Sequence, residues 1–488
     1  MTTDSNQTKP AAEDQRYESR GKLATGGKVI NYEASAAWLP LTDGDTRKAE
    51  VFHTYYRIPR RAAPGRPLTF VFNGGPGAAS AYLHVGTVGP KRVECGKEGE
   101  LPAAPARLVD NKESWLTFTD LVFVDPVGTG LSKSLPGETP EGSKKPAAPD
   151  PLYWDANKDL EALCEFIAAF LSREGRWGSP VYIAGESYGG YRCARLVRML
   201  QEKAGIGLSG AILISPAMEW DNLFASRFNS LAAAIRLPSY AAAARRHGRC
   251  ENSRKGESLE AFMLRAEEFA LQRYLPVIAG GGGEPELPDS FVNSVSQWIG
   301  LTPAQITSHS GMPGIEGFVR SLLRDQGKVL GLYDAGTMTD DPFPGSESFR
   351  GIDPTLGGLN RLYTVATNQH LRDNLGVDSE RHYELLNYDV NSRWQWRDEK
   401  TGSPIPPGAT EDLAVGLGMN PQMKLCIVHG IYDLVTPYFE SKYLVHQLSR
   451  GSSLANSISL HSYEGGHMFY MWQKSRRNFT RDVAGLYR

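Results

Sequence analysis

Residues 181–190 read VYIAGESYGG, a short apolar run that leads directly into the pattern Gly-x-Ser-x-Gly. The run is typical of a buried strand, and residues 191–203 have the pattern of a helix. A serine on a sharp turn between a strand and a helix forms a nucleophile elbow. Gly185 and Gly189 flank Ser187, where a Cβ atom would clash. The sequence therefore predicts a nucleophile at Ser187; because the pattern fixes three residues, an accidental match is the alternative.

The composition is that of a soluble globular protein. The chain has 488 residues, of which 41% are hydrophobic and 22% charged, and its net charge is -2. No basic cluster indicates a nucleic-acid surface or a polybasic membrane anchor. No apolar run approaches the roughly 18 residues of a spanning helix. We therefore expect neither a nucleic-acid partner nor a membrane.

The cysteines and the N-terminal residues indicate the cellular compartment of the protein. An odd count, wide spacing and the lack of a CxxC pattern argue against a disulfide framework or a zinc site; the residues are Cys95, Cys164, Cys193, Cys250 and Cys426. We expect no metal and no cofactor. Residues 1–15 are polar and lack the basic start and apolar centre of a secretory signal. The expectation is a cytoplasmic chain, although a secreted protein without its leader would look similar.

The order of patterns along the chain predicts an α/β fold. Up to residue 218, strand patterns such as 120–125 and 209–215 alternate with helical ones such as 157–173. With the elbow, this indicates an α/β-hydrolase fold, a mostly parallel central sheet flanked by helices. Helical patterns dominate the middle of the chain and predict an inserted, mainly helical cap. The expected divisions are a disordered tail (1–20), the first part of the core (21–218), the cap (219–358) and the second part of the core (359–488).

A catalytic serine needs a histidine base and a carboxylate that orients it. In this fold they follow the serine in the order acid, then histidine. Asp433 directly follows a buried-strand pattern at 424–429, and His467 follows the last strand pattern on a Gly-Gly turn. The alternatives are a helix-capping aspartate and a structural histidine. Rival histidines by composition are His84, His370, His429 and His461.

Acyl transfer also needs backbone N–H groups that stabilise the developing oxyanion. One comes from the residue after the nucleophile, here Tyr188, and the other from a Gly-rich loop after an earlier strand. Residues 73–77 (NGGPG) directly follow the strand pattern at 68–72 and occupy that position. A generic Gly-Pro turn is the alternative.

At these motifs the chain resembles the serine carboxypeptidase family. Residues 73–77 (NGGPG) resemble the family's oxyanion loop, and residues 185–190 (GESYGG) are close to its Gly-Glu-Ser-Tyr-Ala-Gly elbow. Residues 430–433 (GIYD) and 466–468 (GHM) match its acid and base blocks. The resemblance runs from about residue 50 to the C-terminus, with a weaker match in the cap.

The resemblance assigns roles to named residues. It implies a triad of Ser187, His467 and Asp433. It implies an oxyanion hole formed by the N–H groups of Gly75 and Tyr188. It also implies that the substrate's terminal carboxylate is bound by Asn73 and Glu186. Acidic side chains near that carboxylate are thought to share protons with it, which favours acidic pH because close like charges cannot all ionise cheaply.

The sequence departs from the family pattern at three places. A second acid is expected at position 87, where this chain has Thr87. Residues 78–80 (AAS) replace the usual Cys-Ser-Ser, and residues 469–470 (FY) follow Gly-His-Met where the family soon has a proline. These departures keep hydrolysis plausible but weaken the case for a strict carboxypeptidase that works best in acid.

Three hypotheses follow. The first is a serine-type carboxypeptidase that hydrolyses C-terminal peptide bonds through an acyl-enzyme. The second keeps the triad but changes the substrate: an esterase, an aminopeptidase-like hydrolase or an acyltransferase. The third is a non-catalytic binding module on the same fold. The expected partner is a peptide or a small acyl substrate, and a homodimer is compatible with the sequence.

Overall fold

A computed structural model describes residues 15–59, 65–136, 151–224, 226–280, 286–346, 351–396, 407–450 and 454–488. Most of the expected tail, residues 1–14, lies outside the described residues. The expected boundary at residue 20 is wrong, because the first strand, β1 (Arg16–Thr25), already pairs with β2 (Lys28–Asp43) from Arg16 onward. The polar character of Arg16–Arg20 reflects a largely solvent-facing strand, not a tail.

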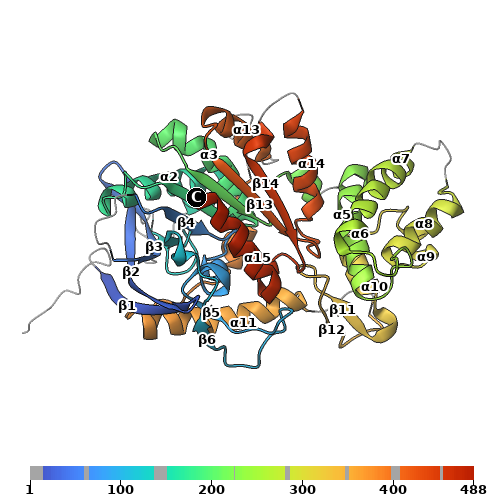
Figure 1. The fold of residues 1–488 in the computed structure, drawn as a ribbon, viewed down its shortest axis with the longest axis horizontal. Helices are drawn as coiled ribbons and strands as arrows, with labels where there is room; N and C mark the ends of the chain where they lie inside the picture. The colour runs from blue at the N-terminus through green and yellow to red at the C-terminus, as the bar shows by residue number, and fades with distance from the viewer. Residues whose placement is uncertain are drawn as a thin grey trace, which may run out of the picture.

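One ten-stranded sheet forms the centre of the molecule (Figure 1). Its spatial order is β1, β2, β3 (Thr46–Arg57), β7 (Asp120–Val124), β4 (Leu68–Phe72), β9 (Val181–Glu186), β10 (Gly210–Ile214), β13 (Lys424–Gly430) and β14 (Ile458–Tyr463), with β8 (Lys133–Ser134) beside β3. From β7 to β14 neighbouring strands are parallel, whereas β1, β2, β3 and β7 pair antiparallel. The mostly parallel sheet with the elbow after β9 confirms the predicted α/β-hydrolase fold.

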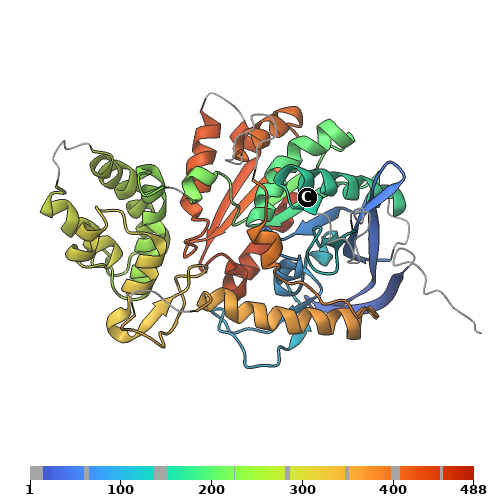
Figure 2. The same cartoon turned by 180° about the vertical axis from the view of Figure 1, so that it is seen from behind.

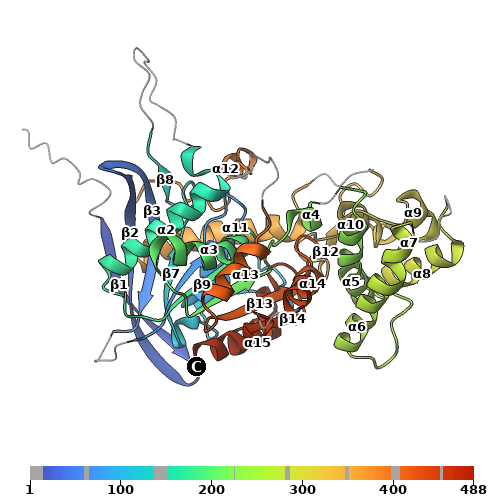
Figure 3. The ribbon, with the colours of Figure 1, turned by 90° about the horizontal axis from the view of Figure 1, so that it is seen from above.

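Helices cover both faces of the parallel strands. One face packs against α2 (Ala156–Arg173), α3 (Tyr188–Ala204) and α13 (Thr410–Met419), and the other against α11 (Pro354–Gln369) and α15 (Gln473–Ala484). Figure 1 shows the first group and α14 (Tyr438–Ser449) above the strands and α11 and α15 below, and Figure 3 views the molecule from the side of the first group. Alternate residues of one strand serve opposite faces, as Phe70 and Val71 do. This two-sided burial is why the strands read as continuous apolar runs.

Most of the expected cap segment is helical. Its helices are α4 (Trp220–Leu223), α5 (Ser230–Arg246), α6 (Leu259–Phe269), α7 (Leu275–Ile278), α8 (Asp289–Ile299), α9 (Pro303–Ser308) and α10 (Ile315–Ser321), followed by a hairpin of β11 (Lys328–Leu330) and β12 (Met338–Asp340). Figures 1 and 2 place α5 to α10 together at one end of the molecule, beyond β13 and β14. The description of this segment as a cap remains an interpretation.

Short elements complete the core. They are α1 (Ala81–Leu83), the π-helical turn η2 (His84–Val88), the hairpin of β5 (Lys91–Val93) and β6 (Leu108–Asp110), α12 (Tyr388–Ser392) and the 3-10 turn η9 (Phe469–Met471). Within the described part of the chain, none of the helices combines the length and the apolar character needed to cross a bilayer.

Candidate active site

Ser187 lies on a strained turn between β9 and α3. Its backbone has φ 61° and ψ -123°, a conformation that costs energy for a residue with a side chain. The flanking glycines allow this turn: a Cβ atom on Gly185 would lie 2.0 Å from the carbonyl oxygen of Gly189. The Ser187 N–H donates to the Ile214 carbonyl at the end of β10, over 2.9 Å. The predicted elbow geometry is therefore present, and Ser187 itself is half-buried.

Asp433 and His467, far apart in the sequence, are in direct contact. Nδ1 of His467 lies 2.7 Å from Oδ2 of Asp433, and both side chains are buried. The Asp433 carboxylate is fixed by other donors: Oδ1 accepts from the N–H groups of Val435 (2.8 Å) and Thr436 (3.0 Å). Oδ2 also accepts from the Thr436 hydroxyl over 2.7 Å. The carboxylate is thus held in the orientation that an orienting acid needs.

The end of β10 links these loops to the elbow. Ile214 accepts from the Ser187 N–H, and the next residue, Ser215, donates its hydroxyl to the His467 carbonyl over 2.8 Å. The Ser215 carbonyl accepts from the Thr436 hydroxyl over 3.0 Å. Residues 214–215 therefore join all three predicted triad loops at the carboxyl edge of the sheet.

The electrostatic surroundings favour a charged histidine. Burial opposes the charge, but the carboxylates of Asp433 and Glu186 outweigh it and raise the pKa of His467 above its usual value. A raised pKa makes His467 a stronger base. This suits a residue that must take a proton from a hydroxyl group.

A segment that sequence analysis missed braces both loops. This bracing segment, residues 332–336, follows the strand β11 at the end of the helical region. The Tyr333 carbonyl accepts from the His467 N–H, and the Leu332 carbonyl accepts from the Leu434 N–H over 3.2 Å. The Ala335 N–H donates to the Tyr432 carbonyl over 3.0 Å. These are backbone contacts that any residue type could make, so no motif in the sequence signals them.

Asp334 links the bracing segment to the turn that carries His467, residues 464–472, called the base turn below. Its Oδ2 accepts from the Trp472 indole N–H over 3.0 Å, and its Oδ1 accepts from the Gly336 N–H over 3.0 Å. Burial raises the pKa of Asp334 to about 7. Gly466 lies directly against this segment, because a Cβ atom there would be 2.1 Å from the Tyr333 carbonyl oxygen and 2.4 Å from Asp334 Cα. A glycine before His467 is therefore required by contact with a distant segment.

The predicted carboxylate-binding residues lie beside the elbow. The Asn73 side-chain amide donates to Glu186 Oε2, while its Oδ1 accepts from the Leu83 N–H over 3.0 Å. Burial raises the pKa of Glu186 to about 7. A Cβ atom on Gly74 would lie 2.5 Å from the Tyr188 nitrogen, so the Gly-rich loop closes on the first residue of α3. Gly75 has φ 98°, which favours glycine. The oxyanion role of the Gly75 and Tyr188 N–H groups stays a prediction.

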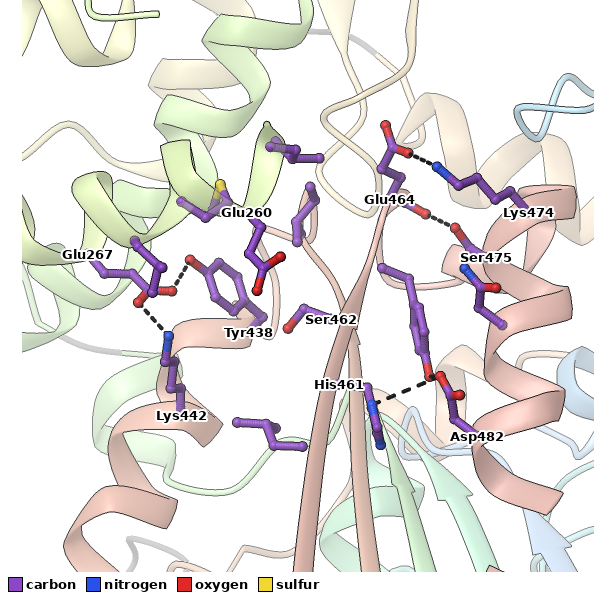
Figure 4. A pocket seen from close by; sticks show the side chains of 17 residues that line it. Glu260, Glu267, Tyr438, Lys442, His461, Ser462, Glu464, Lys474, Ser475 and Asp482 are labelled. Atoms are coloured by element: carbon purple, nitrogen blue, oxygen red, sulfur yellow. Dashed lines mark hydrogen bonds and ion pairs between the residues drawn. The ribbon is translucent and has the colours of Figure 1, made fainter. Parts of the chain in front are cut away.

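The rival histidines make other contacts. The Tyr56 hydroxyl lies 2.7 Å from Nε2 of both His84 and His370, and Nε2 of His429 lies 2.8 Å from the Ser441 hydroxyl. His461 borders a cavity of about 560 Å³ between α6 and the edge strand β14 (Figure 4). There its Nδ1 lies 3.9 Å from Asp482 Oδ2. Of the five histidines considered, His467 is the one in contact with Asp433.

Comparison with known proteins finds a family whose model matches part of the chain. A family model described as "Serine carboxypeptidase" matches residues 34–258, which include the Asn-Gly-Gly-Pro-Gly loop and Ser187 but not Asp433 or His467. Over these residues the chain is similar to the serine carboxypeptidases. The resemblance stated from the sequence motifs is thus confirmed.

The similarity of the chain to curated proteins is distant. Pheromone-processing carboxypeptidase kex1 from Aspergillus fumigatus is 28% identical over 159 residues, which cover 30% of this chain and 21% of that protein. Serine carboxypeptidase-like 36 from Arabidopsis thaliana is 29% identical over 171 residues, 34% of this chain and 31% of the relative. The matches therefore span less than a third of the length of these relatives.

Solved structures also match over most of the chain. A proline iminopeptidase from Mycobacterium smegmatis has a TM-score of 0.36 and 14% identity, covering 92% of this chain and 97% of that one. A peroxisomal alpha-beta-hydrolase from Saccharomyces cerevisiae has a TM-score of 0.38 and 10% identity, with coverages of 96% and 90%. The fold assignment here is based on the strand order and the elbow themselves.

Proposed function

We propose that the protein is a serine carboxypeptidase, which hydrolyses C-terminal peptide bonds through Ser187, His467 and Asp433. The observation that carries the proposal is the 2.7 Å contact between His467 Nδ1 and Asp433 Oδ2, joined through residues 214–215 to the strained turn of Ser187. The family of its relatives supports the same activity.

The proposed reaction has two steps. His467 takes the Ser187 hydroxyl proton at Nε2 while the serine oxygen attacks the scissile carbonyl. Asp433 holds the imidazole with its Nδ1 proton towards the carboxylate and stabilises the imidazolium. The N–H groups of Gly75 and Tyr188 receive the oxyanion. His467 then protonates the leaving amine, and water activated by the same histidine hydrolyses the acyl-enzyme.

The proposed substrate contact is with a free C-terminus. Asn73 and Glu186 would hold the terminal carboxylate beside the leaving amine. Because burial raises the pKa of Glu186 to about 7, its carboxyl group is protonated below that pH and can donate a hydrogen bond to an anionic substrate. The proposal therefore predicts that free-acid substrates bind best at acidic pH.

An esterase, aminopeptidase-like hydrolase or acyltransferase is the second candidate, favoured by one observation. Thr87 is fully buried, and no acid stands at its position. Without a second acid, the preference of the enzyme for substrates with a free C-terminal carboxylate depends on Asn73 and Glu186 alone.

One substrate set separates these candidates. We expect the enzyme to prefer a blocked dipeptide with a free C-terminus over its amide and its methyl ester, assayed from pH 5 to pH 8. Preference for the amide or the ester would favour the second candidate. Ser187→Ala protein serves as the control, and it should neither turn over substrate nor react with a fluorophosphonate probe. Lack of probe labelling in the unaltered protein would point to a non-catalytic module.

A further inference from the structure

Three buried oxygen atoms near the elbow make no hydrogen bond of standard geometry among the residues that the structure describes. They are Glu186 Oε1, the Tyr470 hydroxyl oxygen and Thr87 Oγ1. All three side chains are at most 3% exposed, so bulk water does not replace the missing partners. Buried polar groups without such bonds are costly and need an explanation, and at an active site contact with a bound ligand is one.

Tyr470 and the turn that carries Thr87 are neighbours. Tyr470 lies in η9, three residues after His467, and packs on η2: a Cβ atom on Gly86 would be 3.1 Å from Tyr470 Cε2. Thr87 directly follows Gly86. Positions 87 and 469–470, where the sequence departs from the family pattern, therefore meet in space. The aromatic ring occupies the room beside η2.

Tyr470 also faces Glu186. Burial dominates the pKa values of both groups. Beyond it, a hydrogen-bonding interaction between the Tyr470 hydroxyl and the Glu186 carboxyl raises the pKa of Tyr470 and lowers the pKa of Glu186. Other titratable groups that interact with Glu186 are His467, Asp433, Tyr82 and Tyr363. The hydroxyls of Tyr82 and Tyr363 are already used, by Asn360 Oδ1 (2.6 Å) and Met471 Sδ (2.8 Å). Of these three phenols, Tyr470 is thus the one whose hydroxyl is left to interact with Glu186.

We infer that Tyr470 is a positioning residue for the substrate's terminal carboxylate, acting through Glu186. In the bound state its hydroxyl donates to Glu186 Oε1. Asn73 donates to Oε2 from the other side. The Glu186 carboxyl, held between these donors, presents its proton to the substrate carboxylate. This inference rests on the proposed function and specifies its substrate contact.

The inference explains how a chain with Thr87 could still bind a free C-terminus. A threonine hydroxyl at position 87 titrates at no accessible pH and cannot share a proton with a carboxylate. A phenol that donates to Glu186 supplies the second polar contact without adding a negative charge, so the site holds one acid and not two. The pH dependence of binding is then set by Glu186.

The test compares Tyr470→Phe with Tyr363→Phe, a buried neighbour whose hydroxyl contacts Met471. KM and kcat are measured for the blocked dipeptide acid and its amide from pH 5 to pH 8. We expect Tyr470→Phe to raise KM for the acid about tenfold, with kcat and the amide unchanged, because one donor to a carboxyl is lost. The pH at which KM for the acid rises should move upward, because ionised Glu186 loses a donor. Tyr363→Phe should show neither effect.

Two outcomes would overturn the inference. The first is that Tyr470→Phe raises KM equally for the dipeptide acid and for its amide. The second is that the pH at which KM for the acid rises stays the same in Tyr470→Phe. If Tyr470→Phe does not fold, Glu186→Gln decides instead, because a pH inflection of KM that persists without Glu186 excludes the arrangement. Failure of the proposed function looks different: the unaltered enzyme would then show no preference for the acid over the amide.

Discussion

Two glycines, Gly185 before Ser187 and Gly466 before His467, meet different kinds of neighbour. The close contact of Gly185 is local, with Gly189 four residues on, although Gly189 itself lies against Asn73. The close contacts of Gly466 are remote, since it lies against Tyr333 and Asp334, more than a hundred residues earlier in the chain. Gly185 is required by the geometry of its own turn, and Gly466 is required by contact with a distant segment.

This difference shows where each half of the site is encoded. A turn defined by its own residues produces a recognisable motif, and the family model covers Ser187. A turn held by backbone hydrogen bonds from a distant segment gives no sign of that segment in its own sequence, and the same model ends before Asp433 and His467. The helical region therefore contributes to the base turn through the bracing segment as well as lying beside it.

Asp433→Asn should have the largest effect of the changes that test this comparison. An amide at this position favours the wrong tautomer of His467, so kcat should fall about 10⁴-fold while the fold is retained. Steady-state kinetics beside circular dichroism check this. A loss smaller than tenfold would mean that the contact with His467 is structural and that the two turns do not form one site.

Gly185→Ala should mainly reduce stability. The new Cβ would meet the Gly189 carbonyl at 2.0 Å, and a backbone atom cannot move aside without opening the elbow. We expect a loss of about 3 kcal/mol or more in the free energy of unfolding, measured in urea. Gly178→Ala, just before β9 and with open space around it, is the matched control. Similar stability of both variants would contradict a locally determined elbow.

Gly466→Ala should mainly reduce catalysis. The methyl group would push the base turn away from the bracing segment and displace His467, so kcat should fall about 100-fold, as misplacement of a catalytic group by about 1 Å can do. Thermal unfolding should change less than for Gly185→Ala. Gly485→Ala, which meets no atom within 4 Å, is the control. If Gly466→Ala lost stability but kept kcat, the bracing segment would have no part in positioning the base.

Asp334→Asn should change the pH dependence of stability. In the folded protein the pKa of Asp334 is about 7, against about 4 in an unfolded chain. Between these values the folded state holds a proton that the unfolded state has lost, so this residue lowers the free energy of unfolding as pH rises. Removing it should make stability fall less from pH 5 to pH 8, by roughly 2 kcal/mol, since each pKa unit corresponds to about 1.4 kcal/mol.

Urea unfolding at both pH values measures this difference. Asp45→Asn, at an exposed position in the turn between β2 and β3, is the control and should leave the difference unchanged. An Asp334→Asn variant with the same pH dependence as the unaltered protein would mean that the Asp334 carboxyl is ionised in the folded state. The bracing segment would then carry a negative charge next to the turn that holds His467.

The sequence alone determined the α/β-hydrolase fold, the elbow at Ser187 and the candidates Asp433 and His467. These depend on local signals: apolar runs of strand length, glycines at a strained turn and the order of motifs along the chain. Strand pairing at Arg16–Arg20 was missed because an edge strand that faces solvent has a polar sequence. Tertiary structure alone decided which histidine meets Asp433, which segment braces the two loops and which phenol faces Glu186. Those contacts are made by backbone groups and by side chains far apart in the chain, so their partners are fixed only when the sheet brings the loops to one edge.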